Sequence, residues 1–494
     1  MTRFVQRWTP TLVALLAALS FSQFAAAQRL EERPPNVVFI LADDLGYGEL
    51  GCYGQEKIET PNIDALAEQG VLFTDAYTGA PVCAPARCVL MTGQHPANAQ
   101  VRGNKEGGGW GPDEPEGQWP IAAQTVTVAE LMREAGYVTG AMGKWGLGGP
   151  GSEGHPCFQG FDRFYGYLCQ RVAHNFYPTH LWDNHDVDII NSRYFSAHQR
   201  IPNADAGFAQ FYGEVYAADK MLEHSLAFIE AHQHEPFFLY LPFLEPHVAM
   251  QPPQEWVDHY PEAWDTAPYL GTSGYLPHPR PHAGYAAMIS DLDEHVGAVV
   301  ALIDELGLGE NTLIVFTSDN GPTHDVGGVD TEFFNSAGPL RGRKGSVWEG
   351  GIRVPMVARW IGTIAPGTTT DHQTCFQDLM ATLADLTDQD APDNCDGISY
   401  LPLLTGEGEQ QQHPYLVWEF HGYGGQKAVR IGDWKAVLRD IHKGNTEILL
   451  FNLADDLGET TNVAADHPEI VAQARTIFET DRTPSPNFPM QAFD

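Results

Sequence analysis

The sequence predicts a protein of the α/β class, with a large doubly wound sheet, parallel or mixed, flanked by helices. Three observations carry this prediction. Near-continuous apolar runs, such as residues 36–42 and 312–317, are typical of strands buried on both faces of a sheet. Amphipathic stretches at helical spacing alternate with these runs, as in βα units. From about residue 413 the pattern changes to short β-like runs, which predicts a smaller C-terminal antiparallel sheet with a helix near Pro468.

The elements of the large domain follow one another along the chain. We expect strands at 36–42, 137–142, 237–242 and 312–317, and helices opening at Thr60-Pro61 and spanning 127–136 and 285–306. Proline suits the first turn of the first helix, where Ile63 and Leu66 share one face. Gly136 ends the second helix. The expected strands of the small sheet lie at 415–420, 428–431, 435–438 and 448–451.

The first 27 residues have the pattern of a secretory signal peptide. Arg3 and Arg7 precede an apolar run at 12–21, and Ala25-Ala26-Ala27 forms a small-residue cleavage site. No later stretch is long and apolar enough to span a membrane. We therefore expect an exported protein, periplasmic or secreted and not transmembrane, with a catalytic domain at 28–412 and a small subdomain at 413–494.

The chain is strongly acidic. It has 28 Lys and Arg against 64 Asp and Glu, a formal net charge of −36 over 494 residues. This charge repels nucleic acid and anionic membranes, so neither is expected as a partner. A local basic pocket can still bind a small anion. The acidity itself is explained by solubility or by a saline habitat, where salt screens the self-repulsion.

The seven cysteines are an odd number for an exported chain, where thiols tend to pair. They cannot all pair within one molecule. If one is consumed by other chemistry, six remain, and Cys157–Cys169 and Cys375–Cys395 become candidate short-loop disulfides.

Acidic residues follow two of the predicted strands. Asp43 and Asp44 come after the first strand, and Asp319 and Asn320 after the strand at 312–317. Ligands of open α/β sheets bind beyond the carboxyl ends of strands. Three carboxylates and one amide oxygen suit a hard cation, Ca²⁺ or Mg²⁺, whereas zinc would favour histidine. The alternative is that these residues are ordinary turn or N-cap residues.

A second motif is Cys83-Ala84-Pro85-Ala86-Arg87, followed by Thr92-Gly93. If a helix begins at Pro85, Cys83 and Arg87 stack one turn apart on the same face. A group at position 83 then lies at a helix N-terminus, which attracts anions. The alternative is a disulfide-bonded Cys83 and a surface Arg87.

These residues resemble the signature of type I sulfatases, whose motif cysteine is oxidised to Cα-formylglycine. The resemblance covers nearly the whole mature chain, through residues 42–46, 51–54, 60–64, 143–145, 246–247, 318–321, 340–344 and 350–355. It implies an alkaline phosphatase-like fold and a formylglycine-generating or sulfatase-maturating enzyme as a partner. It also explains the odd cysteine count.

The resemblance further implies a role for each site residue. Asp43, Asp44, Asp319 and Asn320 would hold one calcium ion, which also contacts formylglycine 83 and a sulfate oxygen. The hydrated aldehyde attacks sulfur, Arg87 orients it, and Lys144 and Lys344 neutralise the sulfuryl group. His247 would protonate the departing sugar oxygen, and His324 would contact the substrate sugar.

One departure from the family pattern lies at Gly146. The family often has histidine in this place, with a role in the elimination step. Either another group serves here, with His155, His174 or His180 as candidates, or calcium and the lysines suffice.

The sequence therefore predicts a sulfuric ester hydrolase that removes sulfate from a sulfated carbohydrate. One alternative is a phosphoester or phosphonate hydrolase of the same superfamily. The other is a non-catalytic, calcium-dependent glycan-binding protein, which applies if Cys83 is never oxidised. The sequence leaves the sugar and the sulfate position open, although a saline habitat favours algal or animal polysaccharides.

Overall fold

The computed structural model describes residues 33–109 and 116–494. The predicted signal peptide, residues 1–27, lies outside this part of the chain. Within the described residues, no helix has both the length and the apolar character needed to cross a membrane.

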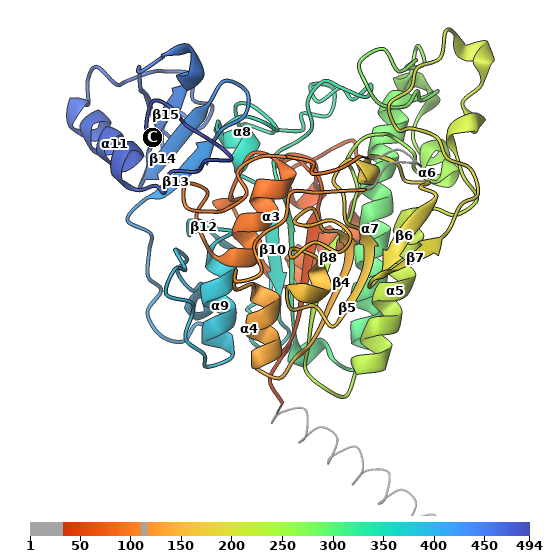
Figure 1. Cartoon of the computed structure of the whole chain (residues 1–494), viewed down its shortest axis with the longest axis horizontal. Helices are drawn as coiled ribbons and strands as arrows, with labels where there is room; N and C mark the ends of the chain where they lie inside the picture. The colour runs from red at the N-terminus through yellow and green to blue at the C-terminus, as the bar shows by residue number, and fades with distance from the viewer. Residues whose placement is uncertain (1–32, 110–115) are drawn as a thin grey trace, which may run out of the picture.

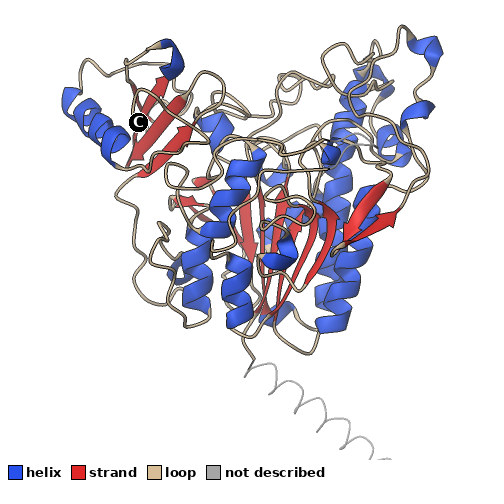
Figure 2. Ribbon diagram, in the orientation of Figure 1, coloured by secondary structure: helices blue, strands red, loops and turns tan. Residues whose placement is uncertain are grey.

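A mixed sheet of ten strands forms the centre of the molecule (Figure 2), in the order β11-β2-β10-β9-β1-β8-β4-β5-β6-β7. The strands are β1 (Asn36–Ala42), β2 (Val71–Phe73), β4 (Val138–Lys144), β5 (Arg163–Tyr167), β6 (His180–Asp183), β7 (Asp186–Ile189), β8 (Phe237–Pro242), β9 (Thr312–Ser318), β10 (Met356–Arg359) and β11 (Thr368–Thr370). The central strands β9, β1, β8, β4 and β5 run parallel, whereas β10 is antiparallel to β9 and β2. A separate parallel pair joins β3 (Ala76–Tyr77) to β12 (Thr374–Cys375).

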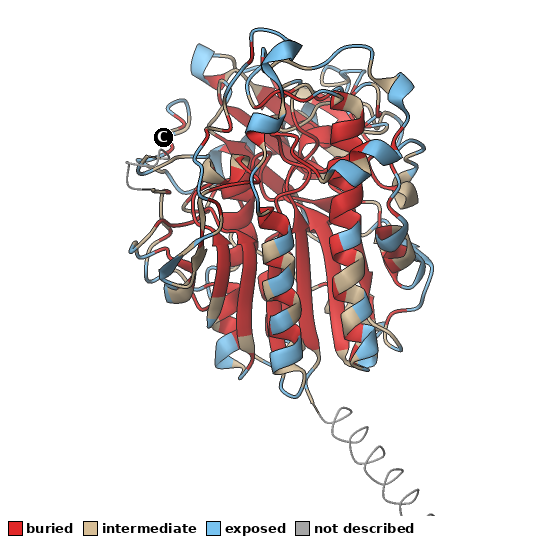
Figure 3. Cartoon of the chain, turned by 90° about the vertical axis from the view of Figure 1, so that its right-hand side faces the viewer, coloured by how far each residue is buried: buried red, intermediate tan, exposed pale blue. Residues whose placement is uncertain are grey.

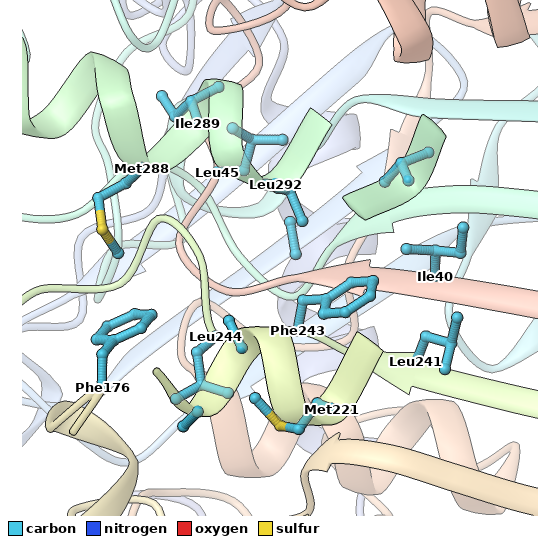
Figure 4. Close-up of a cluster of buried hydrophobic side chains, with 14 of the residues drawn as sticks. Ile40, Leu45, Phe176, Met221, Leu241, Phe243, Leu244, Met288, Ile289 and Leu292 are labelled. Atoms are coloured by element: carbon cyan, nitrogen blue, oxygen red, sulfur yellow. The ribbon is translucent and has the colours of Figure 1, made fainter. Parts of the chain in front are cut away.

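Strand β1 divides its side chains between two hydrophobic cores, because successive residues of a strand point to opposite faces. Val38 and Ile40 belong to one core, and Val37 and Phe39 to the other. Figure 4 draws part of the first core, including Ile40. The burial of β1 on both faces explains its uninterrupted apolar sequence.

Helices cover both faces of the sheet, and their inner sides are buried (Figure 3). The first core receives side chains from α2 (Pro61–Glu68), α5 (Ala217–His232), α6 (Gln254–His259) and α7 (Pro281–Glu305). The second receives them from α3 (Cys83–Thr92), α4 (Val128–Glu134), α9 (Asp378–Leu386) and α10 (Leu401–Thr405). In Figure 1, α3, α4 and α9 lie toward the left of the large sheet, and α5 and α7 lie toward its right.

A four-stranded antiparallel sheet follows, as the C-terminal pattern predicts (Figure 1). It comprises β13 (Leu416–Phe420), β14 (Gln426–Ile431), β15 (Trp434–Arg439) and β16 (Leu449–Asn452), and α11 (Pro468–Thr480) comes after it. Trp418 packs on Tyr77 of the large domain, with ring centroids 5.3 Å apart. Ile477 and Phe478 of α11 pack on the other face. One face of the small sheet therefore joins the large domain, near α8 (Glu349–Ile352).

The predicted elements are confirmed, with shifts at their ends. The helix expected from residue 285 begins at Pro281, and the strand expected at 137–142 runs to Lys144. Helix α3 begins at Cys83 and not at Pro85. Proline therefore lies in the first turn, where its missing N–H costs no hydrogen bond.

The expected disulfides are wrong. All seven cysteines are free thiols in the structure. The sulfur of Cys157 faces the side chain of Asn184 at 3.6 Å, and that of Cys375 faces the carbonyl oxygen of Thr78 at 3.7 Å. The thiols expected to pair thus point to other neighbours, although the sequence separations are short.

Candidate active site

The two acidic strand ends meet at one edge of the sheet. Strands β1 and β9 are parallel neighbours in which Ala42 is paired with Ser318, so the residues that follow them emerge together. The N–H of Asp44 donates to Asp319 Oδ1 at 3.2 Å, and Asn320 Nδ2 donates to Asp44 Oδ1 at 2.8 Å. Asp43, Asp44, Asp319 and Asn320 are all fully buried. This is the convergence that the sequence predicts.

Helix α3 directs Cys83 and Arg87 into the same place. Cys83 is the first residue of the helix, and its thiol donates to Asp43 Oδ1 at 3.4 Å. One turn later, Arg87 Nη2 lies 2.8 Å from Asp319 Oδ2 and 3.3 Å from Asp43 Oδ2. Arg87 is 0% exposed, so the alternative of a surface charge is wrong.

Two lysines complete the charge balance around these carboxylates. Lys144, the last residue of β4, forms an ion pair with Asp43 Oδ2. Lys344 Nζ lies 2.6 and 2.9 Å from the two carboxylate oxygens of Asp44 and 3.4 Å from Cys83 Sγ. With Arg87, three cations, of which Arg87 and Lys144 are buried and Lys344 is half-buried, surround position 83 in a chain that is otherwise strongly acidic. The site can therefore attract a small anion despite the net charge.

His247 follows β8, and its side chain lies next to that of Asp44. Its Nδ1 bonds to the carbonyl oxygen of Val248, and its Nε2 lies 3.7 Å from Asp44 Oδ2. Burial, and then the nearby charge of Lys344, lower the pKa of His247 to about 4. The imidazole is therefore neutral near pH 7 in this state, with Nε2 available to exchange a proton.

His324 lies farther out. It is partly exposed, and its Nε2 is 3.3 Å from the hydroxyl of Tyr423 in the small domain. Burial and then Lys344 lower its pKa. The turn between β13 and β14 of the C-terminal sheet thus reaches the edge of the site.

The carboxylates and the thiol have shifted pKa values. Burial raises the pKa of Asp43, but Lys144 and the other nearby positive groups outweigh burial and hold it well below its usual range. Burial and then the repulsion by Asp43 raise the pKa of Asp319 to about 6. The same two causes raise the pKa of the Cys83 thiol to about 12. An unmodified Cys83 would therefore stay protonated and be a poor nucleophile.

The donor atoms around Asp44 fit a hard cation. Asn320 Oδ1 is buried and has no hydrogen-bond partner among the described residues. Asn320 Nδ2 of the same amide donates to Asp44 Oδ1, and Asp44 belongs to a cluster in which Asp43, Asp44, Cys83 and His247 each offer a ligand atom within 4.8 Å of the others. A cation bound by oxygen would satisfy the orphaned amide oxygen and offset the repulsion among the carboxylates.

Of the three candidate histidines, one lies at this site. His174 stacks on His247, with ring centroids 4.6 Å apart and an angle of 16° between the rings. His155 stacks instead on His185, and His180 Nε2 lies 3.2 Å from a carboxylate oxygen of Glu116. The structure therefore brings His174, and not the other two, to His247 and the carboxylate cluster.

Another side chain occupies the space beside Gly146, and the sequence analysis missed it. A Cβ atom added to Gly146 would lie 1.8 Å from Gln170 Nε2. Gln170 is 2% exposed, and neither polar atom of its side chain has a hydrogen-bond partner within the described residues. A histidine at position 146 would require this amide to move. No motif marks Gln170 in the sequence.

The fold and the site together define the class of protein. A mixed α/β sheet carries a carboxylate cluster at its carboxyl edge, with Cys83 at a buried helix N-terminus beside it. This is the alkaline phosphatase-like fold that the sequence analysis expected. Structural neighbours include a phosphonate monoester hydrolase of Agrobacterium radiobacter, with 20% identity and a TM-score of 0.63 over 90% of this chain and 95% of that one. At this identity the likeness concerns the fold alone.

The chain belongs to the sulfatase family. The family model described as Sulfatase matches residues 35–389, and a model described as N-sulphoglucosamine sulphohydrolase, C-terminal, matches residues 343–479. Arylsulfatase A of Bos taurus is 33% identical, over 94% of this chain and 88% of that protein. The protein is therefore a sulfuric ester hydrolase of the type I sulfatases.

A bacterial relative has a similar degree of sequence identity to this chain. An N-acetylgalactosamine-6-O-sulfatase of Bacteroides thetaiotaomicron is 29% identical, over 91% of this chain and 93% of that enzyme. Among solved structures, Ps i-CgsB has 26% identity and a TM-score of 0.74, and the alignment covers 93% of this chain and 95% of that one. Ps i-CgsB has also been solved with k-i-k-neocarrahexaose.

We predict that Gly146→Ala destabilises the protein more than Gly136→Ala does. Both glycines have positive φ angles, 81° and 86°, so both substitutions strain the backbone. Only the alanine at 146 meets another group, because nothing lies within 4 Å of a Cβ at 136. We expect a cost of about 2–3 kcal/mol at 146 against about 1 kcal/mol at 136, measured by chemical unfolding. Equal costs would contradict the assigned contact with Gln170.

Proposed function

We propose that this enzyme removes sulfate from a sulfated carbohydrate, with Cys83 converted to formylglycine and one calcium ion bound. The observation that carries the proposal is the surroundings of Cys83: a buried helix N-terminus, three carboxylates, and the cations Arg87, Lys144 and Lys344. The carbohydrate part is supported by the bacterial N-acetylgalactosamine-6-O-sulfatase and by Ps i-CgsB, which binds a neocarrahexaose.

The buried oxygens hold the metal in this proposal. Asp43, Asp44, Asp319 and Asn320 would bind the calcium ion, which supplies a Lewis acid to polarise the sulfate ester. The formylglycine at position 83 would supply an oxygen nucleophile. It would replace the Cys83 thiol, which stays protonated because its pKa is raised.

The remaining residues bind the sulfuryl group and move protons. Arg87 stays paired with Asp43 and Asp319 and fixes the group at position 83. Lys144 and Lys344 donate to the oxygens of the transferring group, where negative charge must be stabilised. His247 Nε2 gives a proton to the departing sugar oxygen. A bound sulfate ester raises the pKa of His247, because its negative charge favours the imidazolium form.

His174 takes the place of the histidine that the family often has at position 146. Its Nδ1 lies 3.0 Å from His198 Nε2, which fixes the ring. Burial, and then the charges of His247 and Lys144, hold the pKa of His174 well below its usual range. In this state the imidazole is neutral and weakly basic. The negative charge of a sulfate group bound at position 83 would raise its pKa, and the ring could then accept the proton that release of sulfate requires.

Export and domain organisation complete the proposal. The enzyme is directed to the periplasm or the outside by residues 1–27, and a formylglycine-generating or sulfatase-maturating enzyme converts Cys83. Residues 28–412 form the catalytic domain and 413–494 the smaller subdomain. The proposal keeps His324 as a contact to the sugar, because its ring lies at the outer edge of the site.

The first test compares aryl sulfate with aryl phosphate. We expect matured enzyme to hydrolyse the sulfate at least about a thousandfold faster, and Cys83→Ala to abolish this activity, because the nucleophile is lost. Mass analysis of the peptide that contains residue 83 should show loss of the sulfur atom. A fully active enzyme with an intact Cys83 thiol would disprove the mechanism. Preference for phosphate would favour the phosphoester alternative, and an unconverted, inactive chain the glycan-binding one.

A second test concerns the metal. Calcium should raise the unfolding temperature of the protein, because it binds the folded state alone. Asn320→Leu removes the orphaned oxygen and should weaken calcium binding about tenfold or more, measured by calorimetry. The control is Asp258→Asn, whose carboxylate is on the surface with 68% of its side chain exposed. Unchanged calcium affinity in Asn320→Leu would place the ion elsewhere.

A third test concerns His174. We expect His174→Gln to lower kcat for a sulfate ester about a hundredfold with little change in KM, since it removes a proton acceptor and not a binding group. The matched control is His180→Gln. This variant should keep its kcat, because the His180 ring pairs with Glu116 and does not contact His247. If both variants retain kcat, calcium and the lysines suffice without an imidazole in this role.

A further inference from the structure

Two tyrosines beside the site have left-handed backbone conformations. Tyr275 has a φ of 60° and Tyr423 a φ of 48°. Bulky side chains rarely adopt this region, which costs about 1–3 kcal/mol and is often retained at functional sites. Both tyrosines contact histidines of the proposed site, so each is a candidate for a role in binding.

Tyr275 is already enclosed by other rings. Its ring centroid lies 4.7 Å from that of His198, 5.3 Å from that of His174 and 5.9 Å from that of His247. Burial raises the pKa of its hydroxyl to about 12. Tyr275 therefore packs the histidines together and has little surface to offer a ligand.

Tyr423 is fixed in position but open on one side. It lies in the turn between β13 and β14 and is 63% exposed. Its hydroxyl is 3.3 Å from His324 Nε2, and its ring packs against His324 and Phe420, with centroids 5.7 and 5.8 Å apart. The ring thus has a fixed orientation without being covered.

The position of this ring is tied to the catalytic lysine. A Cβ added to Gly345 would lie 2.8 Å from Tyr423 Cε2, so the tyrosine ring lies directly over the residue that follows Lys344. Gln426 Nε2 in β14 donates to the carbonyl oxygen of Gly345 at 2.8 Å, which anchors this turn to the same segment. Tyr423 therefore lies next to the group that would bind the sulfuryl oxygens.

The local sequence offers an unstrained alternative that the chain does not use. Tyr423 is surrounded by Gly422, Gly424 and Gly425, and a glycine at 423 would fit the positive φ without strain. An exposed tyrosine gains little by burial in compensation. A structural role in the turn therefore does not explain why residue 423 is a tyrosine. A ligand that stacks on the exposed ring does explain it.

We propose that Tyr423 stacks on a sugar ring that adjoins the sulfated unit, so that the enzyme prefers sulfated oligosaccharides to isolated small esters. The apolar C–H face of a sugar ring suits the negative face of an aromatic ring, and a rigid aromatic platform loses little entropy on binding. The inference rests on the proposed carbohydrate sulfatase function. It assigns substrate recognition to the C-terminal sheet as well as to the catalytic domain.

The experiment compares Tyr423→Gly and Tyr423→Phe with the unchanged enzyme on a sulfated oligosaccharide and on a small aryl sulfate. We expect Tyr423→Gly to reduce the ratio of the two kcat/KM values about tenfold, through KM for the oligosaccharide. Tyr423→Phe should keep most of the ratio, since the ring remains. Because glycine relieves the backbone strain, Tyr423→Gly should be at least as stable as the unchanged protein.

The matched control is Tyr194→Gly, which removes another exposed tyrosine, 42% exposed, from a different segment. Its kcat/KM ratio should not change. Calorimetry of oligosaccharide binding to Cys83→Ala, with and without Tyr423→Gly, gives a readout that does not depend on turnover. An unchanged ratio and unchanged binding, or equal losses on both substrates, would overturn the role of Tyr423. Failure of the unchanged enzyme to release sulfate from either substrate would instead overturn the proposed function.

Discussion

The balance of buried charge at the ends of β1 and β9 is the constraint on which the rest of the site depends. Three carboxylates, Asp43, Asp44 and Asp319, lie without exposure to water at one edge of the sheet. Like charges so close are tolerated only with opposite charges or a metal nearby. Arg87, from α3, and the lysines of two other segments supply the opposite charge. This network also determines where a helix N-terminus can present residue 83.

The supporting fold explains why these groups come together. Parallel pairing of β1 with both β8 and β9 directs three successive strand ends to the same edge. His247 follows β8 within five residues, so it reaches the cluster on a short connection. The small C-terminal sheet closes another side, since its turn lies over Gly345. The charge cluster at the edge of the large sheet and the proposed recognition surface on the small sheet are thereby joined across Lys344 and Gly345.

Much of this arrangement could be predicted from the sequence. Apolar runs identified β1, β8 and β9, and the acidic residues after two of them indicated the cluster, because parallel strands must end together. Gln170 and Tyr423 could not be found in this way. Their importance depends on contacts with Gly146 and Gly345, which are 24 and 78 residues away (170 − 146 and 423 − 345). The disulfide prediction failed for a similar reason, since sequence separation says nothing about the direction in which a thiol points.

In the proposed mechanism, residue 83 and four oxygen-bearing side chains share one calcium ion. The most direct measurement is a crystal structure of the matured enzyme, with anomalous scattering used to locate the metal. We expect a single calcium peak in contact with Asp43, Asp44, Asp319, Asn320 and an oxygen of a converted residue 83. A metal bound elsewhere, for example among the buried Glu245, Asp291 and His295, with an intact thiol at Cys83, would contradict it.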